Sequence, residues 1–393
     1  MINALLLNRQ RMDLAPAPVR FPIEDYATVY KNLEDIGIGS VMKRDCFVSE
    51  ISCDYSVLKR LEESEINVDE LDYLAKRLES FSDYELTQFQ GTVVSKDLSD
   101  MTDLINLTFC CQSVTVIQDF TNLSAVGCLH YMSLYGGLAE DDFKTMDFQR
   151  IALSLILYEE GSITPYGVVY ENGMKLEQLY GGKYFPYYRH NNDILLTVAI
   201  MDQSLLEEIR EVAWLYLPAE DCQIERTLIR AEAHKENIQL RYDDGELPAI
   251  LVDMLGTQED IYEINRLCVS FQELSNEYPQ KPEVVLQMVS PTDITKALNI
   301  LTQLDLFDFI PDISTPEEYG KYMIIDSGHY EYDENLEDYV DFKGYGEKRI
   351  FGENGKFTKN GYVSYHGFIS IEEIMAGIET ERMDIEMGGM QLE

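Results

Sequence analysis

The stretch GSITPYGVVY at residues 161–170 has a counterpart near the end of the chain, GKFTKNGYVSY at residues 355–365. In both, two glycines lie six residues apart and enclose a run rich in β-branched and aromatic residues. Such a run around a short turn predicts a β-hairpin, and Asn360-Gly361 supplies residues that a tight turn favours. The two stretches therefore predict the same hairpin at two places in one chain.

The similarity continues along the sequence at a nearly constant offset of 193 to 196 residues. The aligned pairs include Pro22 with Pro218, Asp25 with Asp221, Glu70 with Glu263, Asp119 with Asp312, Gly127 with Gly320, Asp147 with Asp341 and Gly161 with Gly355. An ordered series of this kind indicates a tandem duplication. We expect one copy at residues 1–190, a second at residues 193–377, and an acidic flexible tail at residues 378–393.

Each copy combines strands with helices. The spacing of an apolar helix face occurs twice, at Leu71, Leu74 and Leu78 and again at Ile264, Leu267 and Phe271. FPIEDYATVY at residues 21–30 and YLPAEDCQIE at residues 216–225 each place a proline and two acids before an apolar pattern, which predicts a helix start. Short strands are expected before them, at residues 4–7 and 194–198. The predicted fold class is α+β, an elongated multi-domain chain whose two repeats each contain short strands, amphipathic helices and a C-terminal hairpin.

The composition limits the possible partners. The chain has 71 acidic and 31 basic side chains among 393 residues, which gives a formal net charge of -40. A protein that binds DNA or RNA directly clusters Lys and Arg on one face, and the sequence has no such cluster. The same charge excludes an anionic membrane surface as a partner. With 45% hydrophobic residues, 26 Tyr and 16 Phe, the chain is nonetheless expected to fold.

Cysteine usage and hydropathy predict a soluble, cytoplasmic protein. The seven cysteines show no spacing suited to disulfides or zinc. No window approaches the roughly 18 apolar residues of a membrane-spanning helix. The first ten residues, MINALLLNRQ, contain a four-residue apolar run without a cleavage site behind it, which does not fit a secretion signal.

No catalytic or metal-binding pattern is present in the sequence. The five histidines are scattered, and none lies three or four residues from another. EYDENLED at residues 331–338 places oxygen-bearing side chains at alternate positions, as a calcium loop does. However, Leu336 occupies the position that needs a glycine, and Phe342 occupies the position that needs an acid. We therefore expect no enzymatic activity, no cofactor and no metal.

The negative charge is concentrated in the second copy. Residues 1–196 contain 30 acidic and 16 basic side chains, whereas residues 197–393 contain 41 and 15. Solubility ordinarily needs a net charge of only about 2 to 8 units on a small domain, so a larger excess indicates a role in binding. The candidate partner-binding residues are Asp312, Glu317, Glu318, Asp326, Glu331, Asp333, Glu334, Glu337, Asp338 and Asp341 in the second copy, and Glu140, Asp141, Asp142 and Asp147 in the first.

The size of the charge fits DNA mimicry. Duplex DNA carries one charge per roughly 1.7 Å of its axis, so a net charge of -40 corresponds to about 70 Å of duplex. Carboxylates in such a pattern would accept hydrogen bonds from the Arg and Lys side chains of a DNA-binding groove. The charge therefore predicts a protein that occupies a DNA-binding partner in place of DNA.

Three segments resemble the ArdA antirestriction proteins of conjugative elements, namely FPIEDYATVYKNLEDIG from Phe21, INVDELDYLAKRLESF from Ile66 and SGHYEYDENLEDYVDF from Ser327. The resemblance extends over essentially the whole chain, once per repeat. It implies an inhibitor of type I restriction-modification enzymes that mimics DNA, from a family of elongated, acidic proteins that dimerise. Typical members are half as long, so we expect a homodimer or an intrachain pseudo-dimer. The short antirestriction motif of the family has a loose counterpart in residues 331–342.

Other functions stay open at this point. The target of a DNA mimic can be another DNA-targeting defence nuclease, for example a CRISPR effector. An acidic interaction scaffold that does not mimic DNA accounts for the repeat but not for the charge, and an unrecognised hydrolase is a third alternative. A continuous band of exposed carboxylates would favour a mimic over a scaffold.

Overall fold

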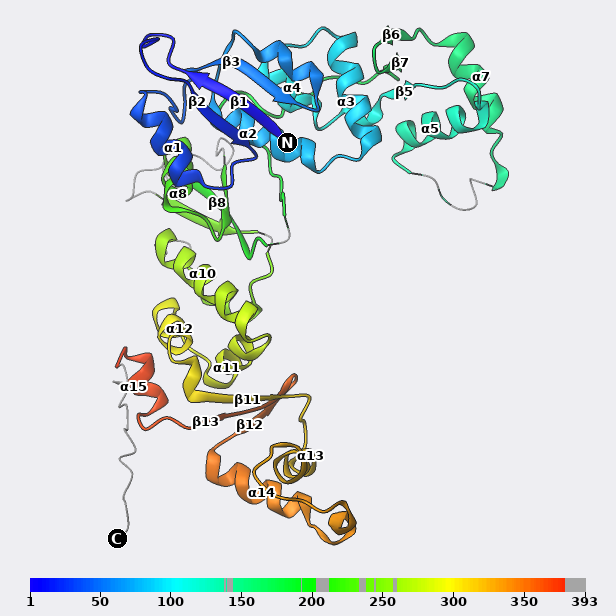
Figure 1. Ribbon diagram of the computed structural model, residues 1–393. Helices are drawn as coiled ribbons and strands as arrows, with labels where there is room; N and C mark the ends of the chain where they lie inside the picture. Colours follow the sequence, from blue (N-terminus) through cyan, green and yellow to red (C-terminus); the bar gives the residue numbers. More distant parts are fainter. Residues whose placement is uncertain are drawn as a thin grey trace, which may run out of the picture. The chain divides into compact units, whose positions relative to one another are not determined.

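Small sheets alternate with helices along the chain (Figure 1), so the fold class is α+β, as the sequence predicts. The computed structural model describes residues 1–137, 139, 144–191, 193–202, 212–232, 238–243, 245–256 and 260–378. By packing, the chain divides into two units. The first unit comprises residues 1–193, 199–215 and 219–239, and the second comprises residues 194–198, 216–218 and 240–393.

The first unit begins with a four-stranded sheet in the order β2-β1-β3-β4. Its strands are β1 (Ile2–Leu7), β2 (Ala17–Phe21), β3 (Cys46–Cys53) and β4 (Glu65–Ile66). Strand β1 pairs with both β2 and β3 in antiparallel fashion. Buried and more exposed residues alternate along β1 and β2, which places one face of the sheet in the core.

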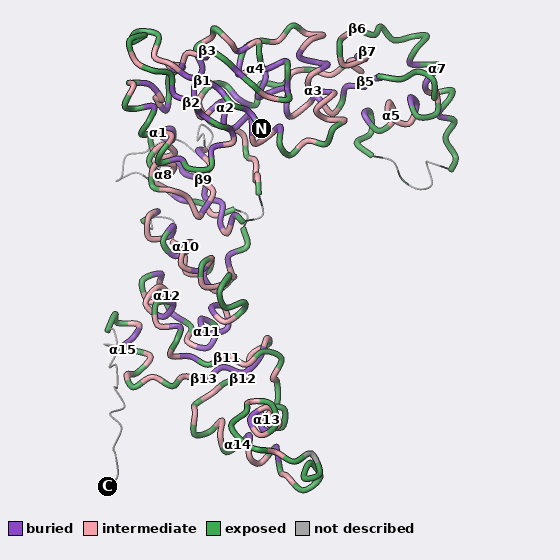
Figure 2. The backbone as a smooth tube through the Cα atoms, viewed as in Figure 1, coloured by how far each residue is buried: buried purple, intermediate pink, exposed green. Residues whose placement is uncertain are grey.

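Helices share a hydrophobic core with this sheet. They are α1 (Tyr26–Asp35), η1 (Ser56–Leu61), α2 (Val68–Glu79), α3 (Asp83–Ser95), α4 (Met101–Leu107) and η2 (Cys111–Ser113). Leu33, Leu71, Phe89 and Leu104 of four of these helices join the buried strand residues in one hydrophobic core. Figure 2 shows buried residues along these strands and helices.

The two predicted amphipathic helices are confirmed. They are α2 and α10 (Ile261–Glu277), and their predicted apolar faces are buried. Asn67 caps α2 by accepting hydrogen bonds from the backbone amides of Asp69 and Glu70. Acidic residues in the first turn of α2 and basic residues in its last turn match the helix dipole.

The predicted helix starts are also confirmed, but the prolines have a different place. Helix α1 follows its N-cap Asp25, and α8 (Asp221–Arg230) follows its N-cap Glu220. Pro22 and Pro218 directly follow the strands β2 and β9 (Ala213–Leu217), outside the first helical turns. A proline has no N–H for a strand ladder, which fits the end of a strand. The two expected strands are β1 and β8 (Leu196–Asp202). Strand β1 begins two residues before the expected start and ends as expected, whereas β8 begins two residues and ends four residues later than expected.

Two three-stranded sheets share one strand order. The first sheet has the order β5-β7-β6 and the second has the order β11-β13-β12. The strands are β5 (Thr115–Ile117), β6 (Ser162–Thr164), β7 (Gly167–Tyr170), β11 (Phe307–Pro311), β12 (Lys356–Thr358) and β13 (Gly361–Tyr365). In each sheet the predicted C-terminal hairpin is present, as β6-β7 and as β12-β13.

The turn of the second hairpin lies one residue earlier than predicted. Thr358 pairs with Gly361, so the turn residues are Lys359 and Asn360, and Gly361 is the first residue of β13. Gly361 has a φ of 150°, and a Cβ there would lie 2.3 Å from the carbonyl oxygen of Ile310. The positive φ and the close approach of β11 therefore both require this glycine.

A helical hairpin accompanies each of these sheets. In the first unit it consists of α5 (Leu123–Tyr135) and α7 (Phe148–Tyr158), and in the second of α13 (Pro316–Lys321) and α14 (Phe342–Glu353). A Cβ on Gly127 would lie 1.9 Å from the Phe148 carbonyl oxygen, and one on Gly320 would lie 2.0 Å from that of Phe342. Both hairpins therefore bring backbones into direct contact at a glycine.

The remaining elements include a three-stranded sheet in the order β10-β8-β9, with β10 at Ile238–Tyr242. The other helices of the second unit are α9 (Ala249–Val252), α11 (Lys281–Val289), α12 (Ile294–Leu301), η4 (Leu304–Leu306) and α15 (Ile371–Met375). The tail expected at residues 378–393 lies outside the described residues except for Ile378.

Candidate partner-binding surface

The acidic run of the second copy lies on the α13-α14 hairpin and the segment that joins its helices. After α13 the chain passes through the π-helical turn η5 (Tyr322–Asp326) and the 3₁₀ helix η6 (Glu334–Tyr339) before it enters α14. The connection between η5 and α14 is exposed over most of its length (Figure 2). Residues 312–341 are termed the acidic segment below.

Close helix packing holds the acidic segment in place. A Cβ on Gly346 of α14 would lie 1.9 Å from the carbonyl oxygen of Pro316, so the two helices also touch here through their backbones. The buried Tyr319 of α13 donates a hydrogen bond to Glu353 of α14 at 2.6 Å, and Arg349 donates to the same carboxylate at 2.9 Å. Burial and the neighbouring Glu353 raise the pKa of Tyr319, so its hydroxyl stays protonated and keeps this bond.

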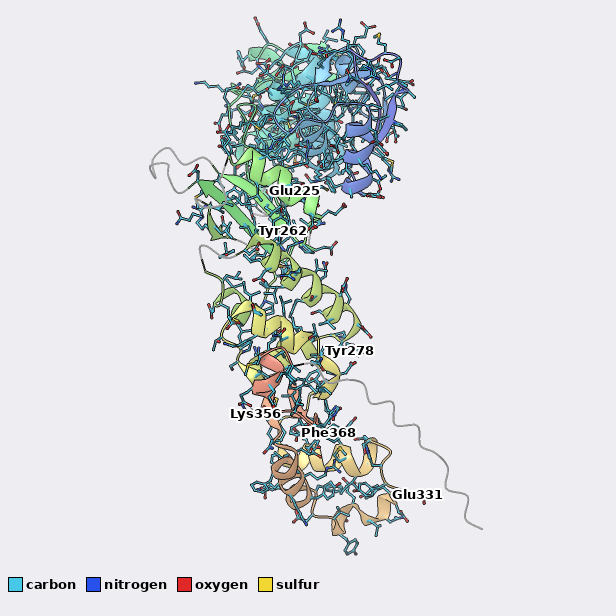
Figure 3. All side chains as sticks on the ribbon, turned by 90° about the vertical axis from the view of Figure 1, so that its left-hand side faces the viewer. Glu225, Tyr262, Tyr278, Glu331, Lys356 and Phe368 are labelled. Carbon is cyan, nitrogen blue, oxygen red and sulfur yellow. The ribbon has the colours of Figure 1, made fainter. Side chains whose placement is uncertain are left out.

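The predicted acids of the acidic segment are at the surface. Every one whose side chain the structure describes is exposed. The side chain of Glu334 lies outside the described residues. Figure 3 shows Glu331 in the α13-α14 region, away from Lys356 of the adjoining sheet. The exposed acids are Asp312, Glu317, Glu318, Asp326, Glu331, Asp333, Glu337, Asp338 and Asp341.

Three of these acids cap helices. Glu318 accepts hydrogen bonds from the backbone amides of Ser314 and Thr315 in the capping box of α13. Asp333 accepts one from the amide of Asn335 at the start of η6, and Asp341 accepts one from the amide of Gly344 at the start of α14. The backbone hydrogen bonds lower the pKa of Glu318 and Asp333. These residues therefore have a structural role in addition to their charge.

The other acids of the segment have fewer contacts. Five side chains form no ion pair or hydrogen bond with the residues that the structure describes, namely those of Asp312, Glu317, Asp326, Glu331 and Asp338. Glu337 pairs with Lys321 at 3.2 Å. These five carboxylates are the residues most available to a cationic partner.

The predicted residues of the first copy give a different result. Asp147 is exposed and caps α7 by accepting a hydrogen bond from the amide of Arg150 at 3.1 Å. It has the same role there as Asp341 has on α14. Glu140, Asp141 and Asp142 lie outside the described residues.

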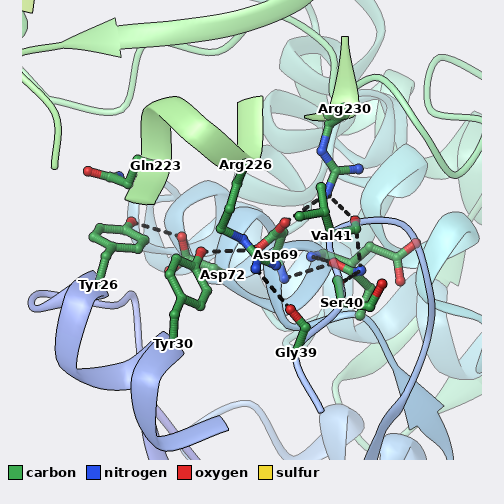
Figure 4. Close-up of polar contacts among 12 residues, drawn as sticks. Tyr26, Tyr30, Gly39, Ser40, Val41, Asp69, Asp72, Gln223, Arg226 and Arg230 are labelled. Carbon is green, nitrogen blue, oxygen red and sulfur yellow. Dashed lines mark hydrogen bonds and ion pairs between the residues drawn. The ribbon is translucent and has the colours of Figure 1, made fainter. Parts of the chain in front are cut away.

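A buried ionic cluster in the first unit was not predicted (Figure 4). Asp69 of α2 is 12% exposed and forms ion pairs at 2.8 Å with both Arg226 and Arg230 of α8. Tyr30 donates a further hydrogen bond to Asp69 at 3.0 Å. Arg226 also donates to the carbonyl oxygen of Gly39, and Arg230 donates to that of Val41. We term this the Asp69 cluster.

In the Asp69 cluster the guanidinium of Arg226 stays charged and the hydroxyl of Tyr30 stays protonated. Burial opposes the charge of Arg226, but Asp69 outweighs this effect and raises the pKa of the guanidinium. Burial and Asp69 also raise the pKa of Tyr30, so its hydroxyl remains a donor. Glu220 at the start of α8 adds a second link, because it accepts hydrogen bonds from the amides of Tyr26 and Ala27. The cluster therefore fixes α8 to α1 and α2.

Within the described residues, no three His, Cys, Asp or Glu side chains gather so that they could hold a metal ion. In the same ranges, no helix combines the length and the hydropathy needed to span a membrane.

Comparison with known families identifies one region. Residues 209–364 match the model of the family described as Antirestriction protein (ArdA). The match covers less than half of the chain, lies within the predicted second copy and contains the whole acidic segment. None of the curated proteins compared with the chain matches it.

Proposed function

Because the chain is an ArdA-type protein over residues 209–364, we propose that it is an antirestriction protein that inhibits a type I restriction-modification enzyme by occupying its DNA-binding groove. The observation that carries this proposal is the coincidence of the matched region with the acidic segment. The described acids of that segment are exposed, and within the described residues only Glu337 has an ion-pair partner. Such carboxylates can accept the Arg and Lys side chains that the enzyme otherwise directs at phosphates.

The net charge supports DNA mimicry over a mode of inhibition that does not depend on charge. A net charge of -40 attracts a basic groove over long distances and increases the association rate at low salt. Binding would release the counterions of the groove, as DNA binding does. We propose that the protein has no catalytic role in this process and acts in the cytoplasm, where restriction enzymes meet DNA.

We also propose that the chain contains two ArdA-like copies. The equal strand order of the two three-stranded sheets supports this. So do the matching helix caps at Asp147 and Asp341 and the matching backbone contacts at Gly127 and Gly320. A duplicated chain would carry within one molecule the surfaces that a dimer of single copies presents.

A binding experiment tests the proposal. The full chain is titrated against a purified type I methyltransferase complex at a series of salt concentrations, with and without a duplex that contains the recognition site. We expect a dissociation constant that rises steeply with salt and a competition between duplex and inhibitor. Simultaneous binding of duplex and protein, or affinity that is independent of salt, would refute mimicry. Inhibition of a CRISPR effector in a parallel assay, without inhibition of the type I enzyme, would assign a different target.

A further inference from the structure

Two apolar side chains of the acidic segment are exposed without an assigned role. In a 3₁₀ helix each turn contains three residues, so residues i and i+3 lie on one face. Leu336 and Tyr339 of η6 have this spacing, and they are 50% and 85% exposed. We term this pair the apolar ridge. Contiguous exposed apolar surface is one feature of protein-binding sites.

Carboxylates border the apolar ridge. By the same three-residue period, Asp338 lies on one neighbouring face of η6 and Glu337 on the other. Asp338 has no ion-pair partner among the described residues, whereas Glu337 pairs with Lys321. A group that binds this surface needs positive charge to face Asp338 and Glu337. It also needs a flat or apolar part to lie against the ring of Tyr339. An arginine side chain combines both properties.

Two arginines of the chain itself are held in this way, each by a carboxylate and an aromatic ring. The guanidinium of Arg226 pairs with Asp69 and lies 4.0 Å from the ring centroid of Tyr30. That of Arg230 pairs with the same carboxylate and lies 4.5 Å from the ring centroid of Phe185. In both cases a carboxylate and an aromatic face hold one arginine together. Tyr339 and its neighbour Asp338 offer the same two groups on the surface.

We propose that Tyr339, together with Asp338 and Glu337, is a docking point for an arginine side chain from the DNA-binding groove of the target. This inference rests on the proposed function: the arginine belongs to the enzyme whose groove the acidic segment would occupy. The guanidinium stacks on the ring of Tyr339 and donates hydrogen bonds to the carboxylates, while Leu336 covers its apolar stem. The stacking contribution persists at high salt, because it releases no additional counterion.

Two substitutions of Tyr339 distinguish the contribution of ring stacking to the affinity from that of apolar contact alone. Tyr339→Phe keeps the aromatic face, so its affinity for the type I methyltransferase complex should stay within about twofold of that of the unmodified chain. Tyr339→Leu keeps an apolar side chain without this face and should bind on the order of fivefold more weakly at every salt concentration, with an unchanged salt slope. Phe368→Leu is the matched control, because Phe368 is fully exposed but lies outside the acidic segment.

The outcomes distinguish this inference from the proposed function. If the unmodified chain shows salt-dependent binding and Tyr339→Leu binds equally well, the arginine docking point is wrong and DNA mimicry stands. An equal loss in Phe368→Leu would also refute it, because the effect would not belong to the apolar ridge. If the unmodified chain does not bind the complex, or binds it independently of salt, the proposed function fails and the docking point fails with it. Melting temperatures of all three variants show whether a loss comes from unfolding.

Discussion

Asp69 and Asp338 are carboxylates of the same acidic chain in opposite surroundings. Asp69 is 12% exposed and binds two arginines and a tyrosine hydroxyl, whereas Asp338 is exposed without an ionic partner among the described residues. A charge removed from water needs partners that replace its hydration, and a surface charge does not. The first carboxylate therefore stabilises the fold, and the second is available for binding.

This difference divides the negative charge of the protein into separate functions. A count of acidic residues treats Asp69, Asp341 and Asp338 alike. However, Asp69 is 12% exposed in an ionic cluster, Asp341 caps a helix, and Asp338 has no ionic partner among the described residues. Only an exposed carboxylate without a structural contact, such as Asp338, can bind a partner without a loss of fold stability. Substitutions that remove one carboxylate of each kind should therefore have effects of different size and on different measurements.

The largest effect is expected from Asp69→Asn. The substitution removes the charge that compensates Arg226 and Arg230, whose side chains are only 14% and 7% exposed. Removing one partner of a buried ionic group typically costs about 3 to 5 kcal/mol, because the remaining charge stays uncompensated. We expect a loss of this size in the free energy of unfolding, measured by urea denaturation with circular dichroism.

Two further variants serve as controls for this prediction. Asp338→Asn should leave the unfolding midpoint unchanged, because Asp338 has no compensating role. The triple variant Asp69→Leu, Arg226→Met and Arg230→Met should recover much of the lost stability, since it removes the whole ionic cluster rather than half of it. A change of less than 1 kcal/mol in Asp69→Asn would show that the contacts of the Asp69 cluster do not stabilise the fold in solution.

The second prediction concerns the unpaired carboxylates of the acidic segment. The combined variant Glu317→Gln, Glu331→Gln and Asp338→Asn should weaken binding to the type I methyltransferase complex roughly tenfold at low salt, because each exposed ion pair contributes little but the three add. The salt dependence of the dissociation constant should become less steep. The unfolding midpoint should fall only slightly, since Glu317 in the first turn of α13 interacts weakly with the helix dipole and the other two side chains have no contact among the described residues.

A triple variant in the first unit controls for net charge alone. Asp54, Glu63 and Glu65 are exposed, and replacing them with Asn, Gln and Gln changes the charge by the same amount. If the acidic segment is the binding surface, this control should lose clearly less affinity. Equal losses in both triple variants would mean that the target senses overall charge rather than the acidic segment.

Local patterns in the sequence predicted the hairpins and helices correctly, because their determinants lie within a few residues. The glycine pairs that open the hairpins and the apolar spacing of Leu71, Leu74 and Leu78 are examples. The turn at Lys359 and Asn360 was misplaced by one residue because Gly361 is required by the approach of β11, which is distant in the sequence. The two-copy architecture stays a prediction, which the matching sheets support.

The candidate site was predictable in composition but not in arrangement. The sequence shows where acids are dense, but not that Asp69 meets an arginine 157 residues away. The spacing of Arg226 and Arg230, four residues apart on one helix, was a signal for a shared partner, although it does not identify that partner. The capping role of Asp341 was detectable, because an aspartate directly before a helix is a typical N-cap.

The third prediction tests this capping role. Asp341→Ala removes the acceptor for the amide of Gly344 and should cost about 1 kcal/mol of stability, measured as a lower melting temperature. Asp147→Ala on α7 should cost a similar amount, because it has the same contact at its own helix. Asp341→Asn keeps the cap and removes the charge, so its stability should stay close to that of the unmodified chain. If Asn and Ala were equally destabilising, charge rather than the capping hydrogen bond would be responsible.

The smallest effect is expected from Asp326→Asn. Asp326 is exposed at the end of η5, caps no helix and has no ionic partner among the described residues. A single exposed ion pair with the target contributes on the order of 0 to 1 kcal/mol, so affinity should change by no more than about fivefold and the melting temperature should not change. Isothermal titration at low salt and thermal denaturation measure both quantities on the same sample. A distributed electrostatic surface tolerates the loss of one carboxylate, whereas a surface that depends on one anchoring acid does not. Complete loss of inhibition in a folded Asp326→Asn protein would therefore show that binding depends on a specific contact at this residue and that the charge of the acidic segment is not shared among many equivalent pairs.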